Sequence, residues 1–225
     1  MWLFDLDNTL HNASQASMPH INERMSQFIE KELNLTRPQA DALRRLYWKR
    51  YGATLLGLVR HHGVRAQAFL DDTHDLHGLE QRVHGHAHDF HALKRLGGRH
   101  YILTNAPRAY AHRVLAALGI RRWFDGVLSV EDMRMFGQLR PKPDARMLRR
   151  TAARLRVHPS ACVLVEDTLE HQKAARRVGM GTVWIQRWRR GDGQGTAGPH
   201  LVRPLRWRPR YVDRSVLGLG EICRL

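Results

Sequence analysis

Short apolar segments alternate with longer amphipathic segments over much of the chain. The apolar segments have strand length and lie at residues 2–4, 99–105, 160–167 and 181–186, with a weaker one at 125–132. The segments between them start with Pro or end just before Gly, as helices often do. These cover residues 108–119, 143–155 and 168–179. Strands that alternate with helices predict a parallel sheet with helices on its faces.

Residues 14–90 follow a different pattern, because they predict helices only. In residues 21–34, the apolar side chains share one helical face: Ile21, Met25, Phe28, Ile29 and Leu33. Further helical segments cover residues 36–52, 54–63 and 65–74. Because this insert comes just after the first strand, it is expected to cover the carboxyl end of that strand. Ligands of open α/β sheets bind at that end.

The two patterns together predict an α/β fold. Its core is a Rossmann-like parallel sheet flanked by helices, formed by residues 1–13 and 91–225, with an inserted all-helical cap domain at 14–90. Residues 187–210 are rich in Arg, Gly and Pro, which predicts a loop. Residues 211–222 predict an edge strand and a short helix.

Composition narrows the class of protein. The 225 residues are 43% hydrophobic, which suits one folded domain with an insertion. The sequence has no apolar run of the roughly 18 residues that a membrane span needs, and its start lacks the basic segment of a secretory signal. Two cysteines, Cys162 and Cys223, are too few for a disulfide framework. These features favour a cytoplasmic enzyme.

The chain is strongly basic, with 37 Lys and Arg against 21 Asp and Glu and a formal net charge of +16. Such a surface attracts anions, including phosphorylated metabolites and nucleic acid. Many of the arginines fall on the exposed face of a predicted helix, as in residues 146–156. No recognised nucleic-acid-binding motif accompanies the charge, so specific nucleic-acid binding is not expected.

Polar residues cluster where predicted strands end. The clusters are Asp5, Asp7 and Thr9; Thr104 and Asn105; Lys142; and Glu166 and Asp167. Lys142 stands apart, because it follows the weak strand by a loop and precedes a helix. Since the carboxyl ends of parallel strands share one edge of a sheet, we expect these groups to converge. Several carboxylates, one lysine and a few hydroxyl or amide groups suit a divalent metal and a phosphate together.

The expected chemistry divides the work between two acids. Asp5 can attack phosphorus and form an aspartyl-phosphate. Asp7 can protonate the leaving alkoxide and later deprotonate the water that hydrolyses this intermediate. An oxygen-only ligand set favours Mg²⁺, while Lys142 and Thr104 would hold phosphate oxygens.

The motifs FDLDNTL, ILTNA, KP and VEDT occur in this order and resemble those of the haloacid-dehalogenase-like superfamily of phosphatases. The resemblance covers nearly the whole chain. It implies Asp5 as nucleophile, Asp7 as acid and base, and Thr9 as loop support. Thr104, Asn105 and Lys142 would lie at the phosphate. Asp167 and the backbone carbonyl of Asp7 would bind magnesium directly, with Glu166 as a further candidate ligand. Dehalogenases lack an acid at the position of Asp7, so its presence favours phosphate chemistry.

Within this superfamily, NTLHNAS and YGATLLGLVRHHG are similar to the pyrimidine 5′-nucleotidase-like group. This similarity implies nucleoside 5′-monophosphates as substrates, with Tyr51 and Thr54 as candidate substrate contacts in the cap. The chain departs from the group's pattern at Ala53, where Thr is usual, and at His171, where Asn is usual. A phosphatase of sugar phosphates or phosphoglycolate is the alternative. A more remote alternative is a nucleic-acid-binding protein with a vestigial core, which the intact acidic motifs oppose.

Three further features allow two interpretations each. His84, His88 and His91 would share one helical face, as a zinc site needs, but a solvated histidine-rich helix is favoured. Tyr47 and Trp48 could stack on a base, but core packing is favoured. Arg108 either contacts phosphate or begins a solvated helix.

Overall fold

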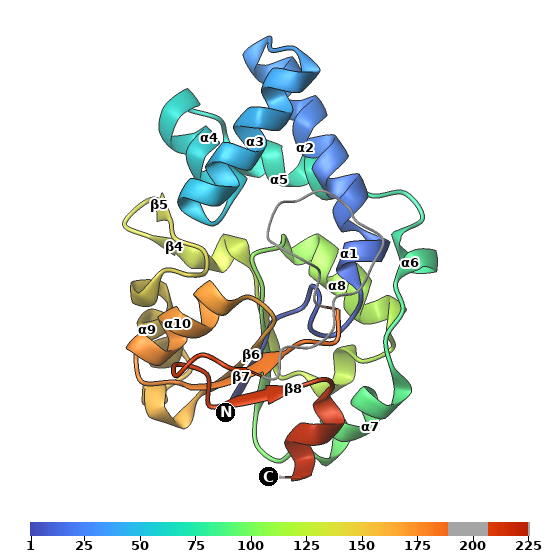
Figure 1. Ribbon diagram of the computed structural model, residues 1–225, viewed down its shortest axis with the longest axis vertical. Helices are drawn as coiled ribbons and strands as arrows, with labels where there is room; N and C mark the ends of the chain where they lie inside the picture. Colours follow the sequence, from blue (N-terminus) through green and yellow to red (C-terminus); the bar gives the residue numbers. More distant parts are fainter. Residues whose placement is uncertain (189–206, 225) are drawn as a thin grey trace.

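The computed structural model describes residues 1–188 and 207–224, and it contains a six-stranded parallel sheet (Figure 1). The strand order is β3-β2-β1-β6-β7-β8. The bounds are β1 Trp2–Phe4, β2 His100–Leu103, β3 Gly126–Leu128, β6 Val163–Glu166, β7 Gly181–Ile185 and β8 Arg214–Val216. The first strand in sequence therefore lies inside the sheet, between β2 and β6. The predicted α/β fold with a parallel sheet is confirmed.

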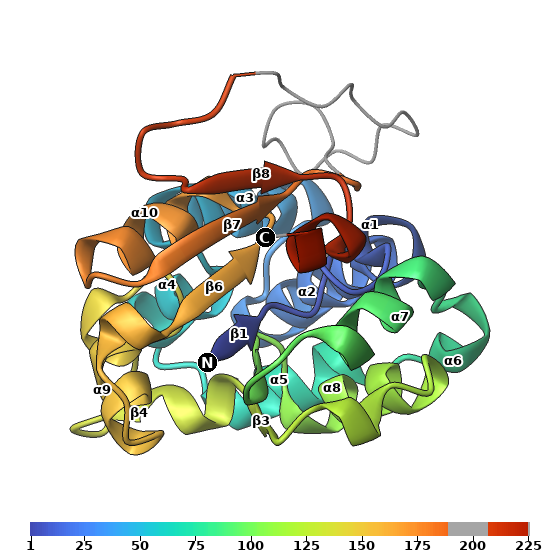
Figure 2. The same cartoon turned by 90° about the horizontal axis from the view of Figure 1, so that it is seen from below.

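The inner strands are mostly apolar on both faces because helices cover both faces. Phe4 of β1 packs into a core that includes helices α7 (Ala87–Arg95) and α8 (Arg108–Ala117). Leu3 faces the opposite way, toward α9 (Ala145–Arg154) and α10 (Leu169–Arg177). Figure 2 shows these two groups of helices on opposite sides of the sheet.

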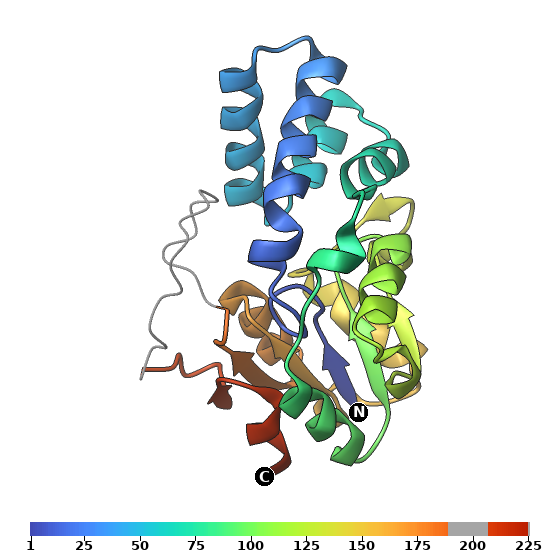
Figure 3. The same cartoon turned by 90° about the vertical axis from the view of Figure 1, so that its right-hand side faces the viewer.

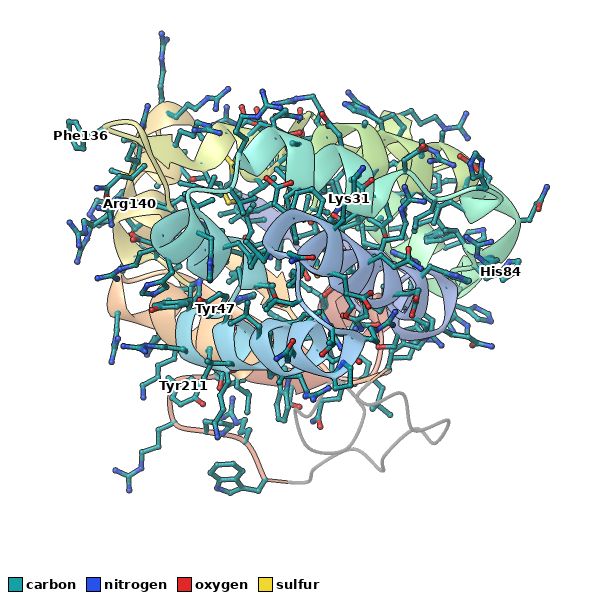
Figure 4. All side chains as sticks on the ribbon, turned by 90° about the horizontal axis from the view of Figure 1, so that it is seen from above. Lys31, Tyr47, His84, Phe136, Arg140 and Tyr211 are labelled. Atoms are coloured by element: carbon teal, nitrogen blue, oxygen red, sulfur yellow. The ribbon has the colours of Figure 1, made fainter. Side chains whose placement is uncertain are left out.

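The remaining short elements connect these layers. They are η1 Arg121–Trp123, η2 Val130–Met133, η3 Pro159–Ala161, η4 Leu219–Arg224 and the antiparallel hairpin of β4 (Arg134–Met135) with β5 (Gln138–Leu139). Phe136 at the tip of this hairpin is 97% exposed and points away from the molecule (Figure 4). Among the described residues, every helix is too short or too polar to cross a bilayer.

The insert after β1 is helical throughout, as predicted. It contains α1 Ala13–Ala16, α2 Met18–Leu33, α3 Arg37–Tyr51, α4 Thr54–His62, α5 Ala66–His74 and α6 Leu79–Arg82. Helices α2–α5 share an apolar cluster, which includes Ile29, Tyr47, Leu58 and Phe69 and which Val130 of η2 joins. They stand beyond the carboxyl edge of the sheet in Figures 1 and 3. The start of α3 is capped by Gln39, whose Oε1 accepts from the Thr36 N–H at 2.9 Å.

Two predicted elements differ from the structure for local reasons. The weak strand at 125–132 ends at Leu128, because Ser129 donates through its N–H to Asp132 at 3.0 Å and so starts the turn η2. The helix predicted from Pro143 begins at Ala145, because the Asp144 carboxylate caps it.

Other predictions were wrong in part. His84, His88 and His91 do not share a helix, since α7 begins at Ala87 and His84 precedes it, pointing outward at the molecule's rim (Figure 4). Tyr47 packs in the cluster of α2–α5, but Trp48 is 49% exposed because it faces away from that cluster.

The last part of the chain is described only in part. The loop predicted at 187–210 falls largely on residues 189–206, which lie outside the described residues. The predicted edge strand and short helix are confirmed as β8 and η4.

Candidate active site

The candidate site lies at the carboxyl edge of the sheet, where polar residues follow neighbouring strands. Asp5 follows β1, Thr104 follows β2, and Glu166 is the last residue of β6. The N–H groups of Asp5 and Thr104 donate to the carbonyls of Val165 and Leu128, at 2.9 and 3.0 Å. The hydrogen bonding of the sheet therefore continues to these residues and fixes their backbones.

Lys142 joins two of the carboxylates. Its Nζ atom lies 2.7 Å from Oδ1 of Asp5 and 2.7 Å from Oε2 of Glu166, and its side chain is 1% exposed. The backbone of Lys142 is held by the side chain of Asn105, which accepts from its N–H at 2.9 Å and donates to its carbonyl at 3.0 Å. Four of the predicted residues are thus brought together.

The carboxylates of this site differ in their affinity for protons. Burial raises the pKa of Asp5 well above its ordinary value, Glu166 and Asp7 add to the rise, and Lys142 opposes it. Burial and the charge of Glu166 likewise raise the pKa of Asp167. Burial also opposes the ionisation of Glu166, but Lys142 and His171 outweigh it and hold the pKa of Glu166 well below its usual range. Full ionisation of all three acids therefore needs further positive charge.

Three of these carboxylates are close enough to share one cation. Asp5, Glu166 and Asp167 each offer an oxygen, and these oxygens lie within 4.8 Å of one another. In the described parts of the chain, no other group of three or more His, Cys, Asp and Glu residues meets this condition. Oxygen ligands suit Mg²⁺, and a cation would offset the repulsion that raises the pKa values of Asp5 and Asp167. The donor set therefore fits the expected magnesium ion.

Both predicted threonines of the site are buried. Thr104 is 1% exposed, and its Oγ1 accepts from the Ala106 N–H at 3.0 Å. Because the hydroxyl accepts in this contact, its own proton stays available for another partner. Thr9 has no exposed surface, and within the described chain its hydroxyl has no hydrogen-bond partner.

Asp7 has two neighbours that the sequence interpretation missed. Its Oδ1 atom accepts from the Tyr110 hydroxyl at 2.8 Å and lies 2.9 Å from Nε2 of His11. The Tyr110 hydroxyl also lies 2.7 Å from Oγ of Ser17. A sequence signal existed for both, since His11 lies four residues after Asp7 in NTLHNAS and Tyr110 lies in the first turn of the helix that follows ILTNA at the sheet edge.

The turn between α3 and α4 lies against the loop of Lys142. A Cβ atom on Gly52 in this turn would come 3.2 Å from Cδ of Pro143. Tyr51 and Thr54 flank the turn, but their hydroxyls are already bonded within the helices. Thr54 donates to the Arg44 carbonyl at 3.1 Å, and the Tyr51 oxygen lies 2.6 Å from Nε2 of His61.

Arg108 and His171 each contact an acidic side chain. Arg108 forms an ion pair with Asp132 and donates to the Val127 carbonyl at 3.3 Å, so its guanidinium is engaged beside β3. His171, where the resembled group has Asn, places Nδ1 2.9 Å from Oε2 of Glu166.

Two proteins of known name are similar in sequence. The chain is 25% identical over 195 residues to phosphate metabolism protein 8 of Saccharomyces cerevisiae, which covers 81% of the chain and 60% of that protein. It is 36% identical over 83 residues to the fructose-1-phosphate phosphatase YqaB of Escherichia coli, which covers 37% of the chain and 42% of that protein. The matches thus span less than two thirds of each relative.

Solved structures share the fold. A haloacid-dehalogenase-like phosphatase from Thermococcus onnurineus superposes with a TM-score of 0.62 at 20% identity, covering 99% of this chain and 95% of that one. An L-2-haloacid dehalogenase from Xanthobacter autotrophicus gives 0.58 at 16% identity, with coverage of 99% and 96%. At such low sequence identity, these structural similarities show only that the fold is shared.

A family model supplies the classification. The model of haloacid dehalogenase-like hydrolases matches residues 2–179, which include β1, β2, β6 and all the carboxylates of the site. Because this match spans more than half of the chain, we conclude that the chain belongs to the haloacid dehalogenase-like hydrolase family.

Proposed function

We propose that the protein hydrolyses phosphomonoesters through an aspartyl-phosphate at Asp5. The observation that carries the proposal is the convergence of Asp5, Lys142, Glu166 and Asp167 at the sheet edge, with Asp5 and Lys142 in contact at 2.7 Å. A carboxylate nucleophile meets an anionic phosphoryl group, so it needs adjacent positive charge. Lys142 provides one such charge, and its burial strengthens its effect.

In this proposal each residue has a defined task. Asp5 attacks phosphorus through a carboxylate oxygen, and the bond from phosphorus to the leaving oxygen breaks. Asp7 gives its proton to that leaving oxygen and then takes one from the water that attacks the aspartyl-phosphate. Thr104 donates its free hydroxyl proton to a phosphate oxygen. The side-chain amide of Asn105 is occupied with Lys142, so its contact with phosphate would fall to its backbone N–H.

Asp5, Glu166 and Asp167, together with the backbone carbonyl of Asp7, would hold magnesium. When bound, the ion supplies positive charge that reduces repulsion between Asp5 and the phosphate. Glu166 also holds Lys142 in place, through the 2.7 Å contact with its Nζ atom.

We propose nucleoside 5′-monophosphates as the first substrate class. The turn of Gly52, between Tyr51 and Thr54, adjoins the Lys142 loop and is therefore one part of the helical insert that could meet a substrate. A sugar phosphate is the second candidate, and the local match to a fructose-1-phosphate phosphatase favours it. Both cysteines are free thiols, which supports a reducing compartment such as the cytoplasm.

A phosphate-release screen tests the proposal. The purified protein is incubated with nucleotides, sugar phosphates and phosphoglycolate, with Mg²⁺ or with EDTA, beside the Asp5→Asn variant as a matched control. We expect release from at least one substrate, loss of release in EDTA, recovery with Mg²⁺, and no release above background by Asp5→Asn. Equal rates for Asp5→Asn and the unmodified protein would exclude Asp5 as the nucleophile.

A further inference from the structure

Asp7 is held by side chains that come from outside its own motif. Tyr110 of α8 and His11, four residues after Asp7, both contact the same carboxylate oxygen, Oδ1, at 2.8 and 2.9 Å. We infer that Tyr110 and His11 are positioning residues, which orient the Asp7 carboxyl group for proton transfer to the leaving oxygen. This inference rests on the proposed function.

The directions of the hydrogen bonds are set by the number of protons. Tyr110 has one hydroxyl proton and donates it to Asp7, so the 2.7 Å contact with Ser17 is made by the Ser17 proton. This contact is much shorter than the 3.4 Å from Oγ of Ser17 to the Ala13 carbonyl, which competes for the same proton. Toward an ionised Asp7, Nε2 of His11 must be the protonated ring nitrogen. Its other nitrogen, Nδ1, is buried and has no hydrogen-bond partner within residues 1–188 and 207–224. Two donors thus converge on Oδ1.

The other carboxylate oxygen is left for chemistry. Within the described chain, the hydrogen bonds of the Asp7 carboxylate all go to Oδ1, and the side chain keeps 15% of its surface exposed. Two donors on one oxygen restrict both side-chain torsions, so Oδ2 points in one direction. A general acid must lie within hydrogen-bond reach of the atom that it protonates, and a fixed Oδ2 meets this requirement before substrate arrives.

Both donors are themselves held firmly. His11 has no exposed surface, and Tyr110 is 1% exposed. Tyr110 also contacts the helical insert at two places, just before α2 and at the end of α5. Ser17 lies at the junction of α1 and α2, and the ring of His74 at the end of α5 meets the Tyr110 ring edge-on, with 5.5 Å between the centroids. The orientation of Tyr110 is therefore fixed from the sheet and from the helical insert together.

Leaving groups of different basicity separate positioning from mere stability. An alkoxide needs a proton to leave, whereas p-nitrophenolate does not. Loss of a well-oriented Asp7 must therefore slow alkyl esters more than p-nitrophenyl phosphate. The quantity to measure is the ratio of kcat/KM for an alkyl phosphate to kcat/KM for p-nitrophenyl phosphate, because kcat/KM covers the steps up to breakage of the ester bond.

The variants are Tyr110→Phe and His11→Leu, each of which removes one donor. We expect the ratio to fall about tenfold or more in each, a part of the roughly 10²–10⁴-fold that a positioned acid contributes. His11→Gln keeps an N–H at the position of Nε2 and should restore most of the ratio. Tyr101→Phe is the matched control, because Tyr101 lies on β2 and packs with the opposite core, and its ratio should equal that of the unmodified protein.

The outcomes are distinct. An equal loss for both esters in Tyr110→Phe and His11→Leu, or no loss for either, would overturn the positioning role while leaving the phosphatase proposal intact. If the unmodified protein hydrolyses neither ester nor any substrate of the screen, the proposed function itself fails. If Tyr110→Phe does not fold, as judged by circular dichroism, the pair His11→Leu and His11→Gln makes the same comparison.

Discussion

Lys142 illustrates how one buried side chain holds the site together. It lies between Asp5 and Glu166, and the three side chains are at most 9% exposed. A buried charge that loses its partner is costly, because neither water nor another ion replaces the lost contact. Lys142 therefore has a structural effect in addition to its proposed contact with phosphate.

We predict that Lys142→Met lowers the free energy of unfolding by about 3–5 kcal/mol in EDTA, the range for breaking a buried ion pair. Added Mg²⁺ should recover part of this loss, because a cation among Asp5, Glu166 and Asp167 offsets their repulsion. Urea unfolding of the variant and the unmodified protein, each with and without Mg²⁺, measures both effects. A variant as stable as the unmodified protein in EDTA would contradict this prediction.

His74 gives a prediction about pH. Burial lowers its pKa to about 4, although Asp7 and Glu131 act in the opposite direction. In the unfolded chain this group has a pKa of about 6.5, so between these values the unfolded state binds the extra proton. The contribution of neutral His74 to the free energy of unfolding is fully present above pH 6.5. It is lost as the pH drops toward 4, by about 3 kcal/mol in total.

His74→Asn removes this titration and keeps a donor near the position of Nδ1. The difference in unfolding free energy between the variant and the unmodified protein, measured by urea unfolding from pH 7 to pH 4, should therefore shift in favour of the variant as the pH falls. A difference that stays constant over this pH range would show that folding does not lower the pKa of His74.

At the residue scale, local motifs carry only part of the site. Asp5, Glu166 and Asp167 could be predicted because each stands in a short motif at a strand end, and Lys142 because it stands in the short motif before a predicted helix. The contact between Asp7 and Tyr110 spans 103 positions and depends on how α8 packs, which no local pattern contains. Tyr51 and Thr54 stay candidate substrate contacts, and their hydroxyls are bonded inside the helical insert.

At the scale of elements, the spacing of apolar residues and the residues at element boundaries predicted most of the helices and strands. The inner strands could be predicted because they are buried on both faces and read as apolar runs. The errors lie at boundaries, as at Ser129 and Asp144, where one side chain bonds to a nearby N–H and decides where an element starts.

The division into a core of 1–13 with 91–225 and a cap of 14–90 stays a prediction. The packing favours an earlier end for the cap, since Leu76, Leu79 and Val83 lie in the same apolar cluster as Phe4 of β1. We therefore propose that the segment after α5 belongs with the sheet.

Helices α3 and α4 pack closely at one glycine. A Cβ atom on Gly57 would lie 2.1 Å from Cγ of Tyr47, so any side chain there must displace the ring. We predict that Gly57→Ala lowers the free energy of unfolding by about 1–3 kcal/mol, as overpacking does. Gly220→Ala is the matched control, because a Cβ there meets nothing within 4 Å. Equal stability of the two variants in urea would argue against this close packing.

At the scale of the whole molecule, the net charge of +16 is the feature that the active site leaves unexplained. Many of its arginines lie on exposed helix faces, such as Arg149 and Arg150 of α9. Scattered exposed charge attracts polyanions without recognising them, and salt weakens such attraction steeply.

We predict weak binding of a fluorescent oligonucleotide at low salt, with no dependence on its sequence, and loss of most of this binding by about 150 mM salt. Fluorescence anisotropy across a salt titration measures it, with two unrelated sequences compared. Tight, sequence-dependent binding that persists at physiological salt would instead favour a nucleic-acid-binding function.

Trapping the intermediate shows whether Asp5 carries the phosphoryl group. Asp7→Asn should still accept the phosphoryl group from p-nitrophenyl phosphate, whose leaving group needs no proton, but should hydrolyse the intermediate slowly. The reaction is quenched with acid and treated with borohydride, which reduces aspartyl-phosphate to homoserine. Peptide mass spectrometry then locates the homoserine in the sequence. We expect homoserine at position 5 only when substrate is present. Modification of a different carboxylate, or none at Asp5 while the unmodified protein turns over, would exclude Asp5 as the phosphoryl acceptor.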